Sequence, residues 1–380
     1  MDMNKDEKIK ILRDLIKIKS VNGNEAKITD YLVKIFENQN IKVQPDYFDE
    51  NSANFVAEIG EGKGPVLCFE GHQDTVAIGD EKQWEHNPFE AEVVGDNIYG
   101  RGAADMKSGL AAAVIALIEL NEKERIPGKI KLIATAGEEF GAKGAYRLVE
   151  SNVLDEVSAM VVGEPTAGRV VHAHSGSLNY RIKSFGKAVH SSIPERGINA
   201  ITGLNYFINA EQRIFANTPL DPVLGEFKHS ITTIKGGSQV NIVPDYAELY
   251  GNIRPTMVLG NQKVKEILTK VIKELNEEHK LRLELEIVHD FFPMSTPAES
   301  IFVKQVVKAA SENFGSKASL GIINGATDAS VYVKKYSKLP VVVLGPDTWK
   351  IAHQTDEMTS ITSYMNTIET YKKIARLFFE

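Results

Sequence analysis

The chain has 380 residues, of which 43% are hydrophobic and 25% are charged, a balance typical of ordinary globular proteins. Its 44 Lys and Arg residues against 51 Asp and Glu residues leave a net charge of −7, which argues against nucleic acid or an anionic membrane as the main partner. The length exceeds one ordinary hydrophobic core and predicts two domains.

The only cysteine is Cys68, which excludes a disulfide framework within the chain and fits a reducing compartment. It lies in an apolar run, where we expect a small buried side chain. The N-terminal residues MDMNKDEKIKIL contain no signal-peptide core, and the longest apolar run, 110–118, is far too short to cross a membrane. We therefore expect a cytoplasmic protein with no membrane partner.

Helices and short apolar strands alternate in the first part of the chain. Apolar residues at helical spacing predict helices over 5–18 and 25–38, and an alanine-rich helix ends near Leu120. Strands are predicted at 52–59, 65–70, 130–136 and 158–163. This alternation predicts an α/β fold with a sheet covered by helices on both faces.

The pattern changes near residue 175. Polar and apolar residues alternate in the strands that follow, and helices are predicted at 195–214 and 261–277. The order β-α-β-β-α-β predicts an α+β insertion of the ferredoxin-like, split-βαβ kind.

After Phe292 the α/β pattern returns. It predicts a helix at 298–313, a strand at 340–345 and a closing helix at 358–379. The expected domains are a catalytic domain made of 1–176 and 291–380, and an inserted domain made of 177–290.

Histidine and acidic residues follow the strands of the α/β part. They are His72 and Asp74 after strand 65–70, Asp105 before the alanine-rich helix, Glu138 and Glu139 after strand 130–136, Glu164 after strand 158–163, and His353 after the strand near 344. Open α/β sheets bind ligands at the carboxyl ends of their strands. The first pair alone could bind a metal, form a catalytic dyad or end a strand, but the full set favours a metal site.

The kinds of side chain also favour a metal site. Two imidazoles and three or more carboxylates suit zinc, with cobalt or manganese as alternatives. A carboxylate can bridge two metals about 3.5–4 Å apart. Adjacent glutamates could divide the work, one as a ligand and one as a base.

The motifs GHQDTV, GRGAADMKSG, AGEEFGAKG and GEPT, together with the late His353, resemble the metal-ligand signature of the M20 metallopeptidases. The resemblance covers nearly the whole chain. It implies a zinc-peptidase-like catalytic domain with a mixed sheet flanked by helices. It also implies that the inserted domain is a lid through which a homodimer forms.

The resemblance further implies two divalent metal ions, with zinc favoured over cobalt and manganese. It assigns five ligands: His72 and Glu164 to one ion, Glu139 and His353 to the other, and Asp105 as the bridge between them. Glu138 would be the general base. Asp74 would form a hydrogen bond with His72, because a ligating imidazole needs its second nitrogen oriented.

Motifs in and after the inserted domain match family positions that serve the substrate. GKAVHSS places His190 where the family has a histidine that reaches into the active site of the partner subunit. Asn241 and Arg254 match substrate-contacting positions, and Gly325 and Thr327 lie in a loop that resembles the lining of the substrate pocket. His190 could instead be a surface histidine, and Arg254 could be a structural ion-pair partner.

The activity implied by the resemblance is hydrolysis, by water, of the amide bond in a small N-acylated amino acid. The chain has no room for the enlarged lid of many family dipeptidases, so its length favours deacylases. N-succinyl-diaminopimelate is the favoured substrate, followed by N-acetylornithine and then by dipeptides or tripeptides. The loop NGATDAS differs from the usual loop of either deacylase, so the acyl group stays open. A non-enzymatic member would need a lost ligand or base, and none is missing.

Overall fold

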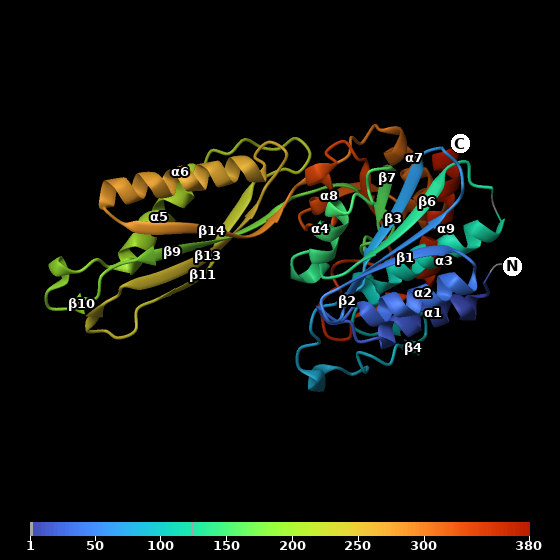
Figure 1. Ribbon diagram of the computed structural model, residues 1–380, viewed down its shortest axis with the longest axis horizontal. Coiled ribbons are helices and arrows are strands. Elements are labelled where there is room, and N and C mark those ends of the chain that lie inside the picture. Colours follow the sequence, from blue (N-terminus) through green and yellow to red (C-terminus); the bar gives the residue numbers. More distant parts are fainter. Residues whose placement is uncertain (1–2, 124) are drawn as a thin grey trace. The chain divides into compact units, whose positions relative to one another are not determined.

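A computed structural model describes residues 3–123 and 125–380, which form two compact units (Figure 1). Of the described residues, those up to 172, 295–321 and 327–380 form the first unit, and 173–294 and 322–326 form the second. Within the described chain, no helix is both long and apolar enough to cross a membrane.

The large sheet has nine strands in the order β1-β2-β6-β3-β7-β17-β8-β15, with β16 beside β8. Their bounds are β1 Lys42–Phe48, β2 Ser52–Ile59, β3 Val66–His72, β6 Lys129–Thr135, β7 Val157–Val162, β8 Val170–His174, β15 Met294–Ser295, β16 Leu320–Ile323 and β17 Val341–Val343. Strands β6, β3, β7 and β17 run parallel, whereas β1 and β2, β2 and β6, and β17 and β8 pair antiparallel. The predicted mixed sheet is confirmed.

Helices cover both faces of this sheet (Figure 1). They are α1 Lys5–Lys17, α2 Ala26–Asn38, α3 Ser108–Lys123, α4 Lys143–Glu150, α7 Ile301–Phe314, α8 Ala329–Lys335 and α9 Ile361–Phe379. Phe69 of β3 packs on Tyr371 of α9, with ring centroids 4.9 Å apart, whereas the next residue, Glu70, lies within 3.5 Å of the Tyr332 hydroxyl of α8. Because neighbouring residues of a strand point to opposite faces, α8 and α9 lie on opposite sides of β3.

The alanine-rich helix α3 is buried along its length from Leu110 to Leu120. Small side chains allow it to approach the sheet closely. At Gly109 a Cβ atom would lie 1.9 Å from the Gly163 carbonyl oxygen, so only glycine fits there. The start of this helix therefore packs against the carboxyl ends of β3 and β7.

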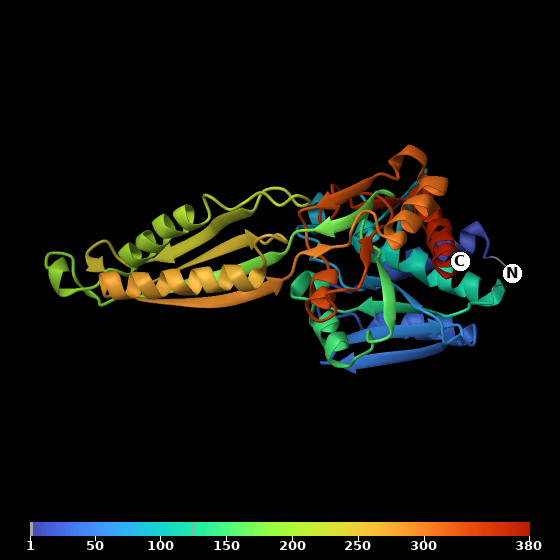
Figure 2. The same cartoon turned by 90° about the horizontal axis from the view of Figure 1, so that it is seen from above.

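The second unit contains a four-stranded antiparallel sheet in the order β11-β13-β9-β14. Its elements are β9 Ser177–Phe185, β10 Val189–His190, α5 Ala200–Ile214, β11 Lys228–Gly236, β12 Ile242–Val243, β13 Tyr246–Arg254, α6 Asn261–His279 and β14 Arg282–Phe291. Helices α5 and α6 share a core with one face of the sheet (Figures 1 and 2). The topology agrees with the predicted ferredoxin-like insertion.

The borders of the second unit lie at 173 and 294, where the sequence placed them at 177 and 290. Residues 322–326, which the sequence assigned to the catalytic domain, belong to the second unit. There the Ser175 N–H donates to the Ile323 carbonyl oxygen at 3.2 Å. A pairing between segments so far apart in the chain leaves no local sequence pattern.

Three predicted helices, α5, α7 and α9, begin later than expected because a capping residue fixes the start of each. Asn199 accepts hydrogen bonds from two N–H groups of the first turn of α5, whereas Ser300 and Ser360 each accept one N–H group, of α7 and α9 respectively. The residues before α9 form a strand instead. This strand belongs to a small sheet in the order β18-β5-β4, with bounds β4 Glu92–Val94, β5 Asn97–Tyr99 and β18 Met358–Ser360.

Short helical turns complete the first and second units. Their bounds are η1 Glu81–Gln83, η2 Ala103–Lys107, η3 Glu138–Phe140, η4 Pro194–Arg196 and η5 Gly315–Lys317. Of these, η2 follows β5 and leads into α3, and η3 follows β6. Both carry acidic residues singled out from the sequence.

Candidate metal centre

Three parallel strands bring the candidate ligands to one edge of the sheet. His72 is the last residue of β3, Glu139 lies in the turn η3 after β6, and Glu164 follows the end of β7. Because β3 pairs in parallel with both β6 and β7, their carboxyl ends meet at this edge.

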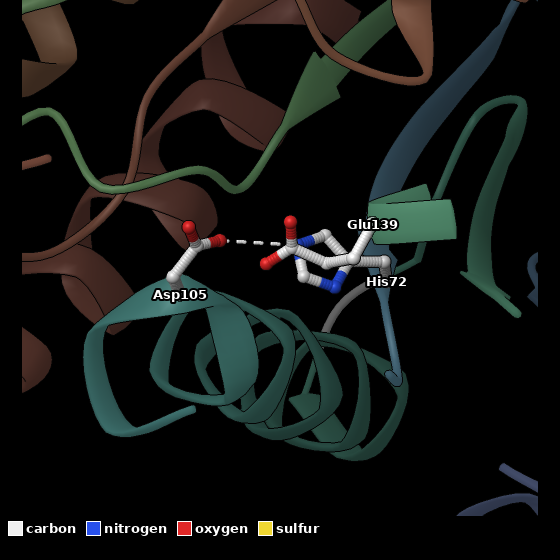
Figure 3. Close-up of side chains that lie close together, drawn as sticks. All are labelled: His72, Asp105 and Glu139. Carbon is white, nitrogen blue, oxygen red and sulfur yellow. Dashed lines mark hydrogen bonds and ion pairs between the residues drawn. The ribbon is translucent and has the colours of Figure 1, made fainter. Parts of the chain in front are cut away.

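The Asp105 carboxylate lies between the two histidines of the cluster. Its Oδ1 atom is 3.1 Å from His72 Nε2, and its Oδ2 atom is 3.3 Å from His353 Nε2. Each histidine also has a second carboxylate: Glu164 Oε1 is 3.7 Å from His72 Nε2, and Glu139 Oε1 is 2.6 Å from His353 Nε2. Figure 3 shows Asp105 directed at His72 with Glu139 beside it. This is the arrangement expected of a bridging carboxylate between two ion sites.

The donor set fits divalent metal ions. His72, Asp105 and Glu139 each offer a ligand atom, and these atoms all lie within 4.8 Å of one another. Glu164 Oε2 is buried and has no hydrogen-bond partner among the described residues. A buried carboxylate oxygen without a partner is costly unless a cation or a proton compensates it.

The charges of the cluster explain its titration. Burial, followed by the charge of Asp105, raises the pKa of Glu164 well above its usual value. Hydrogen bonds to Asp105 and Glu139 raise the pKa of His353 to about 10. Burial acts to raise the pKa of Asp105, but the contacts with His353 and His72 outweigh it and lower that pKa. The carboxylates thus favour positive charge at the imidazoles, as they would favour metal cations in the same space.

Asp74 supports the two glutamates rather than His72 alone. Its Oδ1 atom accepts the Glu138 N–H at 3.0 Å, and its Oδ2 atom accepts the Glu139 N–H at 3.0 Å. His72 Nδ1 lies 3.0 Å from the Asp74 backbone carbonyl oxygen and 3.6 Å from its carboxylate. The sequence predicted that the Asp74 side chain orients the His72 imidazole. In the structure the Asp74 backbone carbonyl is the nearer partner and takes this role.

Glu138 and Glu139 have different surroundings although they are neighbours. The Glu139 carboxylate contacts His353, whereas within the described chain no residue forms a hydrogen bond with the Glu138 carboxylate. Burial raises the pKa of Glu138 well above its usual value. A raised pKa suits a group that must both accept and release a proton near neutral pH.

Comparison with known proteins shows the family of this chain. The sequence-family model described as "Peptidase family M20/M25/M40" matches residues 68–377. The chain belongs to this family. It is therefore a metal-dependent hydrolase of amide bonds, as the sequence predicted.

Two curated relatives in the M20 family cover almost all of the chain. A Staphylococcus aureus protein named "Probable succinyl-diaminopimelate desuccinylase" is 34% identical, over 97% of this chain and 96% of that protein. The "Acetylornithine deacetylase" of Buchnera aphidicola is 28% identical, over 97% of each chain.

Solved structures of M20 proteins share the fold. The M20 family metallo-carboxypeptidase Sso-CP2 from Sulfolobus solfataricus aligns with a TM-score of 0.82 and 20% identity, over 99% of each chain. The YXEP protein of Bacillus subtilis, described as a dinuclear metal binding peptidase, aligns with a TM-score of 0.72 and 20% identity, over 99% of this chain and 98% of that one. At this identity the likeness concerns the fold.

Two of the predicted substrate residues lie together in the second unit of this M20 protein. His190 pairs with Ile242 across the β10–β12 ladder, and the Ser191 N–H donates to the Asn241 carbonyl oxygen at 2.9 Å. The His190 side chain is exposed, and its Nδ1 atom accepts the Ser192 N–H at 3.2 Å. This bond leaves the ring proton on Nε2 in the neutral imidazole.

The remaining predicted substrate residues are divided between the units. Arg254 ends β13, is partly buried, and has no carboxylate partner among the described residues; burial lowers its pKa. Gly325 belongs to the second unit, whereas Thr327 belongs to the first. Thr327 is fully buried, and its hydroxyl accepts the Ala329 N–H at 3.2 Å, just before the start of α8. Their roles toward the substrate stay predictions.

Sequence analysis missed three buried residues beside the ligands. Arg101 and Glu357 form an ion pair of 2.6 Å, and Asp328 Oδ2 accepts a hydrogen bond of 2.6 Å from the Thr135 hydroxyl at the end of β6. Arg101 stands in GRGAAD and Asp328 in GATD, so both motifs contained a signal. Glu357 follows His353 by four residues and lies outside the M20-like motifs.

Proposed function

We propose that this M20 protein removes an N-acyl group from a small amino acid and that N-succinyl-diaminopimelate is its favoured substrate. The observation that carries the reaction type is the Asp105 carboxylate, with one oxygen directed at each of two histidine–carboxylate pairs. The 34% identical relative supports the choice of acyl group.

Five side chains would hold two divalent cations, with zinc favoured: His72, Asp105, Glu139, Glu164 and His353. Bound there, the cations would supply Lewis-acid activation of water and of the amide carbonyl. Glu138 accepts the proton of the attacking water on a carboxylate oxygen and delivers it to the nitrogen of the departing amine. Asp74 supports this transfer because it fixes the backbone of Glu138.

Residues of the second unit would act on the substrate rather than on the cations. The Nε2–H group of His190 donates to the carbonyl oxygen as negative charge develops there. Arg254 holds a substrate carboxylate through a charge-assisted contact. Asn241 and the loop containing Gly325 and Thr327 complete the recognition of the substrate.

N-acetylornithine is the second candidate because of the 28% identical deacetylase, and peptides are the third because the structural relatives are peptidases. The decisive test is kcat/KM of the zinc-loaded protein on all three substrate classes. We expect the highest value for N-succinyl-diaminopimelate. A dipeptide hydrolysed more than tenfold better would replace the proposal with a peptidase.

Replacing Arg254 by Met is expected to lower kcat/KM for the carboxylate-bearing substrate by about 10–100-fold, because a hydrogen bond to a charged group contributes roughly 1.5–3 kcal/mol. A substrate analogue with that carboxylate converted to an amide should show only a small change. The matched control is Arg282→Met, since Arg282 is exposed on β14 and pairs with Glu284. An equal loss of kcat/KM for the carboxylate substrate and for its amide analogue would contradict the role of Arg254 in binding the carboxylate.

We also propose that the protein is a homodimer formed through its second unit. Strand β11 is an edge strand of nine exposed or partly exposed residues. Ile234 on β11, Ile201 on α5 and Ile242 on β12 expose apolar side chains in the same unit. An unpaired edge with apolar neighbours is suited to pairing with a second copy.

If His190 serves the partner subunit, two inactive variants should complement each other. Mixing Glu138→Ala chains with His190→Ala chains would give heterodimers in which one site is intact, so roughly a quarter of parental activity should return after random exchange. Steady-state assays on heterodimers verified by two affinity tags would measure this. No recovery in verified heterodimers would count against action in the partner's site and would leave His190 to act within its own chain.

A further inference from the structure

A buried ion pair lies beside the metal-ligand cluster. Arg101 Nη1 and Glu357 Oε2 are 2.6 Å apart, and the two residues are only 2% and 1% exposed. The pair joins the turn that carries Asp105 to the loop that carries His353. None of the ligand roles assigned above includes it.

Glu357 holds the turn of Asp105 by its backbone. Its Oε2 atom accepts the Gly102 N–H at 3.0 Å, and its Oε1 atom accepts the N–H groups of Ala104 and Asp105, each at 2.9 Å. Buried N–H groups of an irregular turn need such acceptors. The position of the Asp105 carboxylate therefore depends on Glu357.

Arg101 holds the loop of His353. Its Nη2 atom donates to the His353 carbonyl oxygen at 3.4 Å, and its Nη1 atom donates to the Gln354 carbonyl oxygen at 3.2 Å. His353 has a φ of +63° and a side chain that is 49% exposed, whereas His72 is a buried residue of the central strand β3. The hydrogen bonds of the sheet hold His72 in place, whereas His353 lies in a loop and depends on contacts such as those from Arg101.

We propose that Arg101 and Glu357 are positioning residues of the metal centre. Arg101 fixes His353 relative to Asp105 and so raises the affinity of the site formed by His353 and Glu139 for its ion. Glu357 fixes Asp105 and so serves both ions. The inference rests on the two-ion assignment of the proposed function.

The test compares metal affinity at each site separately. In one background, His72→Ala leaves the Glu139–His353 site; in the other, His353→Ala leaves the His72–Glu164 site. Arg101→Lys is added to each, because lysine keeps the charge beside Glu357 but lacks the planar fork that reaches two carbonyl oxygens. Metal-free proteins are titrated with Co²⁺ and followed by calorimetry and by the visible absorption of the bound cobalt.

We expect Arg101→Lys to weaken cobalt binding by about 10–100-fold in the His72→Ala background, as loss of an outer-shell partner typically does. In the His353→Ala background the change should stay within threefold. Glu357→Gln, which removes the charge that holds Asp105, should weaken binding in both backgrounds. The matched control is Arg147→Lys, because Arg147 forms an exposed ion pair with Asp46; it should change neither affinity.

Equal weakening of both sites by Arg101→Lys, or no weakening, would overturn the proposal, since an ion pair that only stabilises the fold cannot discriminate between the sites. If the Arg101→Lys protein does not fold, as judged by its thermal unfolding, Glu357→Asp replaces it: unchanged affinity in both backgrounds would then refute the positioning role. A parent protein that binds fewer than two cobalt ions would refute the two-ion centre itself, which is a different outcome from either of these.

Discussion

The Glu138→Gln protein is expected to retain both metal ions and to lose turnover by roughly 10²–10⁴-fold, the usual contribution of a general base. Glutamine has the same shape but cannot accept the proton of water or deliver one to the leaving amine. The Glu138 N–H bond to Asp74 Oδ1 is a backbone contact, so the substitution leaves the turn intact. Measurements of kcat and of metal content by elemental analysis, on the same preparation, would test both parts.

The matched control is Glu139→Gln, at the neighbouring residue in the same turn. Glu139 contacts His353, so its substitution should weaken metal binding first and activity as a consequence. Excess metal in the assay should then restore part of the activity of Glu139→Gln and none of that of Glu138→Gln. A Glu138→Gln protein within about threefold of the parental kcat would defeat the assignment of the base.

The Asp105→Asn protein is expected to lose affinity for both ions, by at least ~100-fold at each site, since even outer-shell changes cost 10–100-fold. Asp105 directs one oxygen toward each histidine, and an amide has neither the second anionic oxygen nor the charge that offsets two cations. Activity at limiting metal should therefore disappear. Calorimetric titration of the metal-free protein would show two weakened binding events rather than one.

The matched control for this substitution is Asp6→Asn, because Asp6 is exposed in the first turn of α1. It should leave both binding events unchanged. If Asp105→Asn weakened only one event, Asp105 would be a ligand of a single ion, and the centre would lack its bridge. Titration of the His72→Ala and His353→Ala proteins would then show which of the two ions Asp105 binds.

The mixed α/β sheet and the proximity of the candidate ligands could both be predicted from the sequence. Strand β3 could be predicted because its run of apolar residues is a local pattern in the sequence. His72 and Glu164 could be placed together because the carboxyl ends of parallel strands meet at one edge of a sheet. The M20 motifs then suggested what each residue does, since the chemistry of a site restricts the types of residue within it.

The contacts of these residues follow instead from the packing of distant segments. That the Asp74 carboxylate binds the backbone of two glutamates, while its carbonyl orients His72, depends on how two strand ends approach each other. Arg101 and Glu357 are 256 residues apart in the chain and pair at 2.6 Å. The sequence carries no periodic signal for such contacts, because an interaction between distant segments exists only after the core has packed and brought their backbones together.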